Sequence, residues 1–178
     1  MPICREIPPP AGQRVGSFEA CQVYIEGQEC DRPSHNFFQG VVSRETASFE
    51  MDAHADLSRC KDPVCHWVIS YQSDEPATND VIEEDVGRLL EAIGLQQNQF
   101  VAAVHDDTDN RHVHIVANKV GPVGRAASLS WSVVRSERRM AEIALDRGVP
   151  IVPGWHNRGL LADQDAAQRR SLLRLPRG

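Results

Sequence analysis

The window of residues 105–118, HDDTDNRHVHIVAN, holds three of the seven histidines in the chain. Successive side chains of a strand point to opposite faces, so His112 and His114 share one face of a strand that continues to residue 118. Neutral imidazole is a common metal ligand near pH 7. We therefore predict that His105, His112 and His114 bind one metal ion, an arrangement that leaves coordination positions open for catalysis.

The chemistry of such a site stays open at the level of these residues. Imidazole ligands accept Zn, Mn, Fe, Ni or Cu. An ion held in this way could polarise a phosphate or activate water for hydrolysis. Asp107 and Asp109, in the acidic segment between the first histidine and the other two, are expected to orient the ring N–H groups.

A β-hairpin is needed to bring the three histidines together. Residues 99–105 and 112–119 are predicted strands, and the polar segment 106–111 is the predicted turn between them. The apolar residues at 113, 115 and 117 should face the core. Val116 and Asn118 should share the solvent-facing side with the histidines.

The remaining pattern predicts an α+β fold, a central antiparallel β-sheet flanked by helices. Apolar residues recur at helical spacing over 81–93 and 131–147, and glycines follow both segments. Other expected elements are a strand at 66–71, a short strand at 37–42, a short helix at 47–57, a segment at 17–26 that fits helix or strand, an irregular or extended arm at 1–13, and a loose basic helix or tail at 168–178.

Composition is ordinary for a globular protein, but charge is unevenly distributed. Residues 1–118 carry 8 Lys+Arg against 20 Asp+Glu, net −12, whereas residues 119–178 carry 11 against 5, net +6. The basic third suits contact with a polyanion, and equally a solvated helix and tail. No apolar run approaches the roughly 18 residues of a membrane helix and no signal peptide opens the chain, so we expect a cytoplasmic protein without membrane insertion.

The spacing H-x-D-T-D-N-x-H-V-H-I-x-x-N over 105–118 resembles the three-histidine motif of conjugative DNA relaxases, the MOB-P mobilisation nucleases of the HUH endonuclease class. Upstream, PVCHWVIS at 63–70 is similar to the family's second motif, a strand carrying a serine near the DNA. Downstream, GWHN at 154–157 is also similar. The resemblance covers roughly residues 15–157. It implies a palm-like sheet, a relaxase domain at 1–157, and a basic tail or linker stub at 158–178.

The resemblance implies a specific activity. Such bacterial enzymes nick one DNA strand at a plasmid origin of transfer, form a 5′-phosphotyrosyl intermediate with a free 3′-OH, and later reseal the strand. The expected cofactor is a divalent ion, Mg²⁺ or Mn²⁺, with Zn²⁺ as an alternative. The expected partners are single-stranded or hairpin DNA at the origin, accessory relaxosome proteins and a coupling ATPase.

Two tyrosines are available as the nucleophile. Tyr24 occupies the place that the family gives to its nucleophile, whereas Tyr71 has the opposite strand parity to Ser70 and is expected to pack in the core. A phenol is a better leaving group than an alkyl alcohol, which keeps the ester reversible. The general base would be Asp107, Asp109 or one of the histidines.

Further residues are candidates for contact with DNA or with the ligands. Ser70 and Asn118 would touch the ligands or the scissile phosphate. The cationic candidates, which a solvated helix face explains nearly as well, are Lys119, Arg135, Arg138 and Arg139. Two other functions fit the same residues: a three-histidine zinc hydrolase of small molecules, and a non-catalytic origin-binding subunit with the same fold.

Overall fold

The computed structural model describes residues 1–7, 17–27 and 33–172, with the backbone alone at 166–172. Within these residues the strands are β1 (Ile3–Glu6), β2 (His35–Gln39), β3 (Val64–Ser70), β4 (Phe100–His105) and β5 (His112–Asn118). The helices are α1 (Phe18–Ile25), α2 (Ala47–Ala55), α3 (Asn79–Ile93), α4 (Ser132–Arg147) and α5 (Arg158–Leu172). The predicted α+β fold with a central antiparallel sheet is confirmed.

The five strands form one sheet in the order β1-β3-β5-β4-β2, with every neighbouring pair antiparallel. The predicted hairpin is the β4–β5 pair, in which His105 lies opposite His112 and Ala103 opposite His114. Antiparallel pairing keeps opposing side chains on one face. The hairpin therefore brings the three histidines together on one face of the sheet, as predicted.

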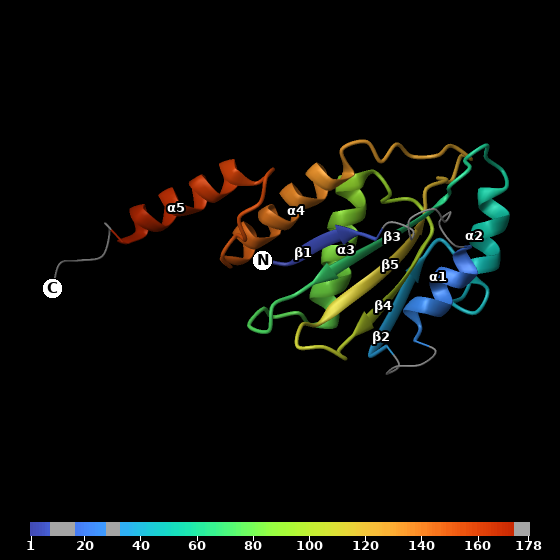
Figure 1. Ribbon diagram of the computed structural model, residues 1–178, viewed down its shortest axis with the longest axis horizontal. Helices are drawn as coiled ribbons and strands as arrows, with labels where there is room; N and C mark the ends of the chain where they lie inside the picture. Colours follow the sequence, from blue (N-terminus) through green and yellow to red (C-terminus); the bar gives the residue numbers. More distant parts are fainter. Residues whose placement is uncertain (8–16, 28–32, 173–178) are drawn as a thin grey trace.

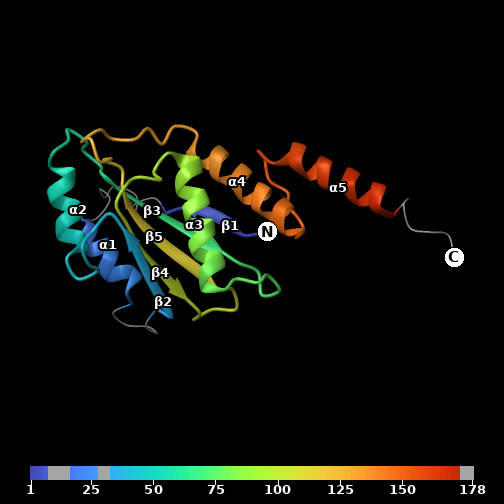
Figure 2. The ribbon, with the colours of Figure 1, turned by 180° about the vertical axis from the view of Figure 1, so that it is seen from behind.

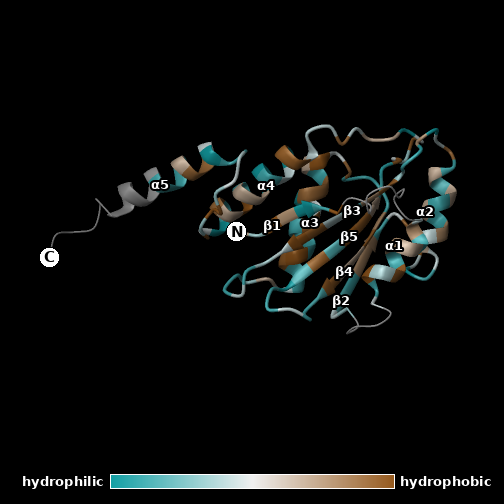
Figure 3. Cartoon of the chain, in the orientation of Figure 1, coloured by the Kyte–Doolittle hydropathy of each residue, from teal (hydrophilic) through white to brown (hydrophobic). Residues whose placement is uncertain are grey.

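Helices cover both faces of the sheet. Figures 1 and 2 show α1 and α2 on one side and α3 and α4 on the other, while α5 extends away from the sheet beyond α4. Val113 and Ile115 pack in the core under α3 and α4, whereas Val116 packs with Phe18 and Met51 under α1 and α2. Hydrophobic residues gather along the central strands and on α3, as Figure 3 shows.

Capping residues set the helix limits near the site. The Ser17 side chain accepts a hydrogen bond from the Ala20 N–H, which begins α1 and resolves the ambiguous segment 17–26 as a helix. Thr78 caps α3 in the same way, and Gly94 ends it in the left-handed conformation (φ +82°), which a residue with a Cβ rarely adopts.

Three predicted segments differ in extent. The strand expected at 37–42 is β2 at His35–Gln39, and part of the arm expected at 1–13 is the edge strand β1. The helix expected only from residue 168 already begins at Arg158. The remainder of the arm, 8–16, and residues 173–178 lie outside the described residues. Among the described helices none is both long and apolar enough to span a membrane.

Candidate active site

The predicted ligands form a compact cluster at the end of the hairpin. Ring centroids lie 5.4 Å apart for His105 and His112, 5.2 Å for His105 and His114, and 5.1 Å for His112 and His114. His105 is buried, whereas His112 and His114 are half-buried. The sequence prediction that these rings converge agrees with their positions.

A fourth histidine, His66, belongs to the same cluster, although the sequence did not predict it there. Its ring centroid lies 5.1 Å from that of His114, and the His66 Nε2 lies 2.9 Å from the His114 Nδ1. The strand register places His66 opposite Val116, on the face of the histidines. His66 and Ser70 are an even number of residues apart on one strand, so the sequence indicates that they share a face. The sequence does not indicate that this strand pairs with β5.

Two of the clustered histidines are oriented by backbone carbonyls. The His105 Nε2 lies 2.7 Å from the Ile25 carbonyl oxygen, and the His112 Nδ1 lies 3.1 Å from that of Asn110. A carbonyl can only accept, so each of these nitrogens carries the proton. The His105 Nδ1 and the His112 Nε2 are left with free lone pairs, the form that binds a metal.

Asp107 completes a group able to hold a metal ion. One ligand atom each from His105, Asp107 and His112 lies within 4.8 Å of the others, and the Asp107 carboxylate is 3.9 Å from the His112 Nε2. Two nitrogens and one carboxylate oxygen suit a divalent cation such as Mn²⁺ or Zn²⁺. His114, the third predicted ligand, lies beside this group.

Tyr24 lies beside the cluster. Its side chain is 67% exposed, and its ring meets His66 and His114 edge-on with centroids 5.9 Å apart in both cases. The carbonyl that binds His105 belongs to the next residue, Ile25, so one hydrogen bond fixes the end of α1 against the hairpin. Tyr71 is buried and donates to Asp85, in agreement with its predicted place in the core.

Burial keeps the inner histidines neutral. It lowers the pKa of His66 to about 4. Burial, followed by the nearby His66, His112 and His105, lowers the pKa of His114 to about 3. Both rings are therefore uncharged at pH 7, the state in which imidazole binds a metal or accepts a hydrogen bond.

The face carrying the histidines is solvated over only part of its length. Ser70 lies opposite His112 and is half-buried, next to the cluster as expected. Val116 and Asn118 are fully buried, because α1 and α2 cover this end of the sheet. The prediction of one continuous solvent-facing side is therefore wrong beyond His114.

Asn118 is occupied in holding the fold together. Its Nδ2 donates to the Met51 carbonyl oxygen of α2 at 3.0 Å, and its Oδ1 accepts from the Val120 N–H at 2.9 Å. With 0% exposure it has no surface to offer to DNA or to a phosphate. The structure therefore contradicts its predicted contact with the substrate.

Asp109 and Lys119 also lie apart from the cluster. Asp109 is exposed and lines a hollow with Gln72 and Glu75, in which no histidine takes part. Lys119 comes directly after the end of β5 and has the opposite parity to Asn118, and its charge acts on Cys65, which faces away from the histidines. Of the two predicted aspartates, only Asp107 is close to the ligands.

The three predicted arginines lie on α4, behind the sheet. Arg139 pairs with Glu91 of α3, and Arg135 donates to the Ser128 and Ser130 carbonyl oxygens. Because α3 and α4 cover the face opposite to the histidines, none of Arg135, Arg138 and Arg139 is placed beside the cluster. Charge counts along the sequence do not say which face of a sheet a helix will cover.

Within the described strands, Arg5 is the cation on the face of the histidines. It is exposed, and it is the only lysine or arginine in the five described strands. Arg5 pairs with Val68, which pairs with His114, so the three share one face. With neighbouring strands about 4.8 Å apart, the Arg5 and His114 backbones lie roughly 10 Å from each other.

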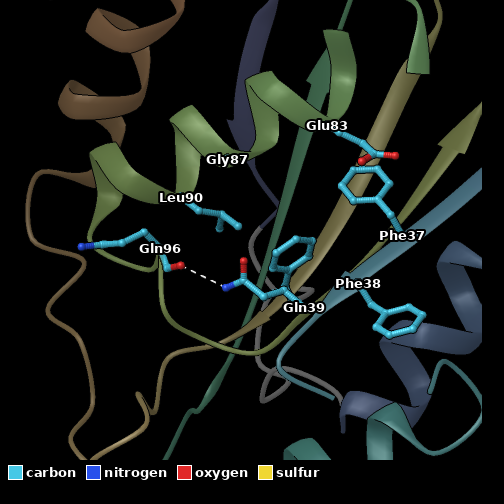
Figure 4. A pocket seen from close by; sticks show the side chains of 8 residues that line it. Phe37, Phe38, Gln39, Glu83, Gly87, Leu90 and Gln96 are labelled. Carbon is cyan, nitrogen blue, oxygen red and sulfur yellow. Dashed lines mark hydrogen bonds between the residues drawn. The ribbon is translucent and has the colours of Figure 1, made fainter. Parts of the chain in front are cut away.

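A hollow between β2 and α3 is separate from this cluster. It is lined by Phe37, Gln39, Glu83, Leu90 and other residues, and Gln39 donates to the Gln96 carbonyl oxygen at 3.0 Å across it (Figure 4). Its lining contains no clustered histidine. The chemistry-bearing residues therefore gather on the other face of the sheet.

Comparison with known proteins finds a matching family model and three similar proteins. A family model, described as relaxase with a MobA/VirD2-like nuclease domain, matches residues 24–149. Protein MobA of Acidithiobacillus ferrooxidans is 34% identical over 64 residues, which is 36% of this chain and 16% of that protein. Two Escherichia coli proteins named TraI are 25% identical over 141 residues (65% of this chain, 19% of theirs) and 26% over 171 (82% and 22%). The chain thus spans less than a quarter of the length of these relatives.

Proposed function

This chain belongs to the MobA/VirD2-like relaxase nuclease family, and from that premise we propose that it nicks and reseals one DNA strand at an origin of transfer. The reaction is a metal-dependent transesterification with Tyr24 as the nucleophile. The observation that carries the proposal is the position of Tyr24, an exposed phenol whose ring contacts two members of a four-histidine cluster. The other tyrosine, Tyr71, is buried on the opposite side of β3.

The proposed step exchanges one phosphodiester for another. The Tyr24 phenolic oxygen attacks the scissile phosphorus, the bond to the 3′ oxygen breaks, and the 3′ oxygen leaves as a hydroxyl after taking up a proton. The phenolic proton passes to a base. Resealing is the reverse, attack by the 3′-OH with release of Tyr24, so the bond energy is conserved in the phosphotyrosyl ester.

The histidine cluster provides the electrophilic side of the site. His105, Asp107 and His112 would hold one divalent cation, with His114 beside them as the third predicted histidine ligand. When bound, such an ion neutralises the negative charge that develops on the phosphate oxygens. Of the predicted bases, His114 contacts Tyr24, whereas Asp109 lines the hollow beside Gln72 and Glu75.

The substrate proposed is single-stranded DNA, or hairpin DNA with a single-stranded nick region. We place its backbone over the open part of the sheet, where Arg5 and Ser70 flank the histidines. Arg5 would bind a phosphate next to the scissile one, since guanidinium groups recognise phosphates with paired hydrogen bonds. This assignment replaces the arginines of α4.

The nicking domain is proposed to comprise residues 1–157, with 158–178 as a basic tail or linker that begins with α5. Accessory relaxosome proteins and a coupling ATPase are proposed as partners from the family resemblance alone. They would act through surfaces other than the histidine cluster.

A covalent-adduct assay tests the proposal. The protein is incubated with Mn²⁺ and labelled single-stranded oligonucleotides that tile the intergenic DNA beside its own gene, and the products are separated on a denaturing gel. We expect an adduct from the wild type and from Tyr71→Phe, and none from Tyr24→Phe, from His112→Ala or after chelation.

Each other outcome points to a different function. An adduct that survives in Tyr24→Phe would refute the nucleophile assignment. DNA binding without any adduct would favour a non-catalytic origin-binding subunit. Hydrolysis of small esters that is independent of Tyr24 would favour a zinc hydrolase.

A further inference from the structure

Each of the three predicted histidine ligands has one ring nitrogen held by a neighbour. For His105 and His112 the neighbours are backbone carbonyls, of Ile25 and Asn110. An acceptor of this kind fixes which nitrogen carries the proton and how the ring is rotated, which raises metal affinity. The same requirement applies to the third ring.

Among the described residues, no carbonyl takes the corresponding place at His114. Its Nδ1 instead lies 2.9 Å from the Nε2 of His66, a side chain on the adjacent strand β3. We propose that His66 is a positioning residue for His114: it accepts the His114 Nδ1–H and so directs the His114 Nε2 lone pair toward the site. The functional consequence rests on the proposed metal-dependent nicking.

The surroundings of His66 favour this role. It is only 7% exposed, and the ring of Tyr24 packs edge-on against it at a centroid distance of 5.9 Å. Water has little access to take its place as the acceptor, so loss of His66 would leave the His114 Nδ1 unpaired. An unpaired imidazole is free to exchange tautomers and to turn its other nitrogen toward the site.

One contact thereby links the metal-binding side to the nucleophile. His66 touches both His114, through a hydrogen bond, and Tyr24, through ring packing. The Nε2 of His66 is occupied by the hydrogen bond with the His114 Nδ1. His66 would therefore act on the reaction through its two neighbours and not as a ligand.

Two substitutions separate hydrogen bonding from packing. In His66→Gln the amide oxygen can still accept from His114, whereas His66→Phe keeps a ring of similar shape without an acceptor. His54→Phe is the matched control, because His54 also has one side-chain hydrogen bond, to the Gly121 carbonyl oxygen at 2.9 Å, but lies outside the cluster.

The tautomer of His114 is read first, by long-range ¹H–¹⁵N NMR of the metal-free protein. We expect the single Nδ1–H tautomer in the wild type, in His66→Gln and in His54→Phe, and a mixture in His66→Phe. Mn²⁺ affinity from calorimetry should fall about 10- to 100-fold in His66→Phe and by less than about 3-fold in His66→Gln. Thermal melts establish that each variant is folded.

An unchanged His114 tautomer in folded His66→Phe, or wild-type Mn²⁺ affinity in that variant, would overturn the proposal. The NMR measurement uses neither DNA nor metal, so it decides the role of His66 even if the wild type forms no adduct. Absence of the adduct would count against the proposed function alone.

Discussion

Acidification should destabilise the metal-free protein through the buried histidines. Burial lowers the pKa of His66 from 6.5 to about 4. The unfolded chain therefore binds a proton at this residue between about pH 6.5 and pH 4 that the folded protein does not bind. The contribution of the neutral His66 to the free energy of unfolding is complete above pH 6.5. This contribution declines as the pH falls and is smallest near pH 4.

The size of the effect follows from the two pKa values. At pH 5 the unfolded state is favoured through His66 by about 2 kcal/mol relative to pH 8. His114, whose pKa is lowered to about 3, acts in the same direction. The free energy of unfolding should therefore be lower at pH 5 than at pH 8 by at least about 2 kcal/mol from this pair.

Urea denaturation at pH 8 and pH 5, in the presence of a chelator, measures this difference. His66→Gln should reduce the pH-dependent loss by about 2 kcal/mol, while Ser70→Ala, which removes no titrating group from the same strand, should keep it. An identical pH-dependent loss in wild type and His66→Gln would refute the reasoning, because another group would then be responsible.

Two further predictions concern the opposite face and the DNA path. Asp85 is fully buried, binds Arg147 through both carboxylate oxygens at 2.6 and 2.7 Å, and accepts a hydrogen bond from Tyr71. Asp85→Ala should therefore lower the free energy of unfolding, measured by urea denaturation, by about 3–5 kcal/mol. Mn²⁺ affinity should stay unchanged, and a loss under 1 kcal/mol would contradict the importance of this pair. Arg5→Ala should weaken the binding of a single-stranded oligonucleotide. It should also reduce, by about 0.7, the magnitude of the slope of the logarithm of the association constant against the logarithm of the salt concentration. Arg138→Ala should change neither the affinity nor the slope. Equal effects in the two variants, measured by fluorescence anisotropy, would contradict the assigned path.

The hairpin and the convergence of its histidines were predictable because both depend on local sequence. Alternation of polar and apolar residues assigns the faces of a strand, and a short polar segment between two strands sets their pairing. The buried residues Val113 and Ile115 confirm that reasoning. The capped helix at 79–93 was similarly determined by its own apolar spacing and by Gly94.

Features that depend on the order of strands and the placement of helices were not predictable in this way. His66 and Arg5 reach the site only because β1 and β3 pair beside β5, an arrangement that no local pattern encodes. Asn118 has the correct parity for the site but is buried, because α2 covers that end of the sheet. The place of Tyr24 beside the histidines was expected from the family resemblance and not from its own segment.

Identification of the modified residue tests the central claim most directly. The covalent adduct formed with Mn²⁺ and an active oligonucleotide is digested with nuclease and trypsin, and the peptide that retains a nucleotide is sequenced by mass spectrometry. Tyr24 and Tyr71 fall in different tryptic peptides, residues 15–44 and 62–88, because trypsin does not cleave the Arg32–Pro33 bond. The account predicts a 5′-phosphotyrosyl nucleotide on Tyr24 in the first peptide. A nucleotide on any other residue would contradict it.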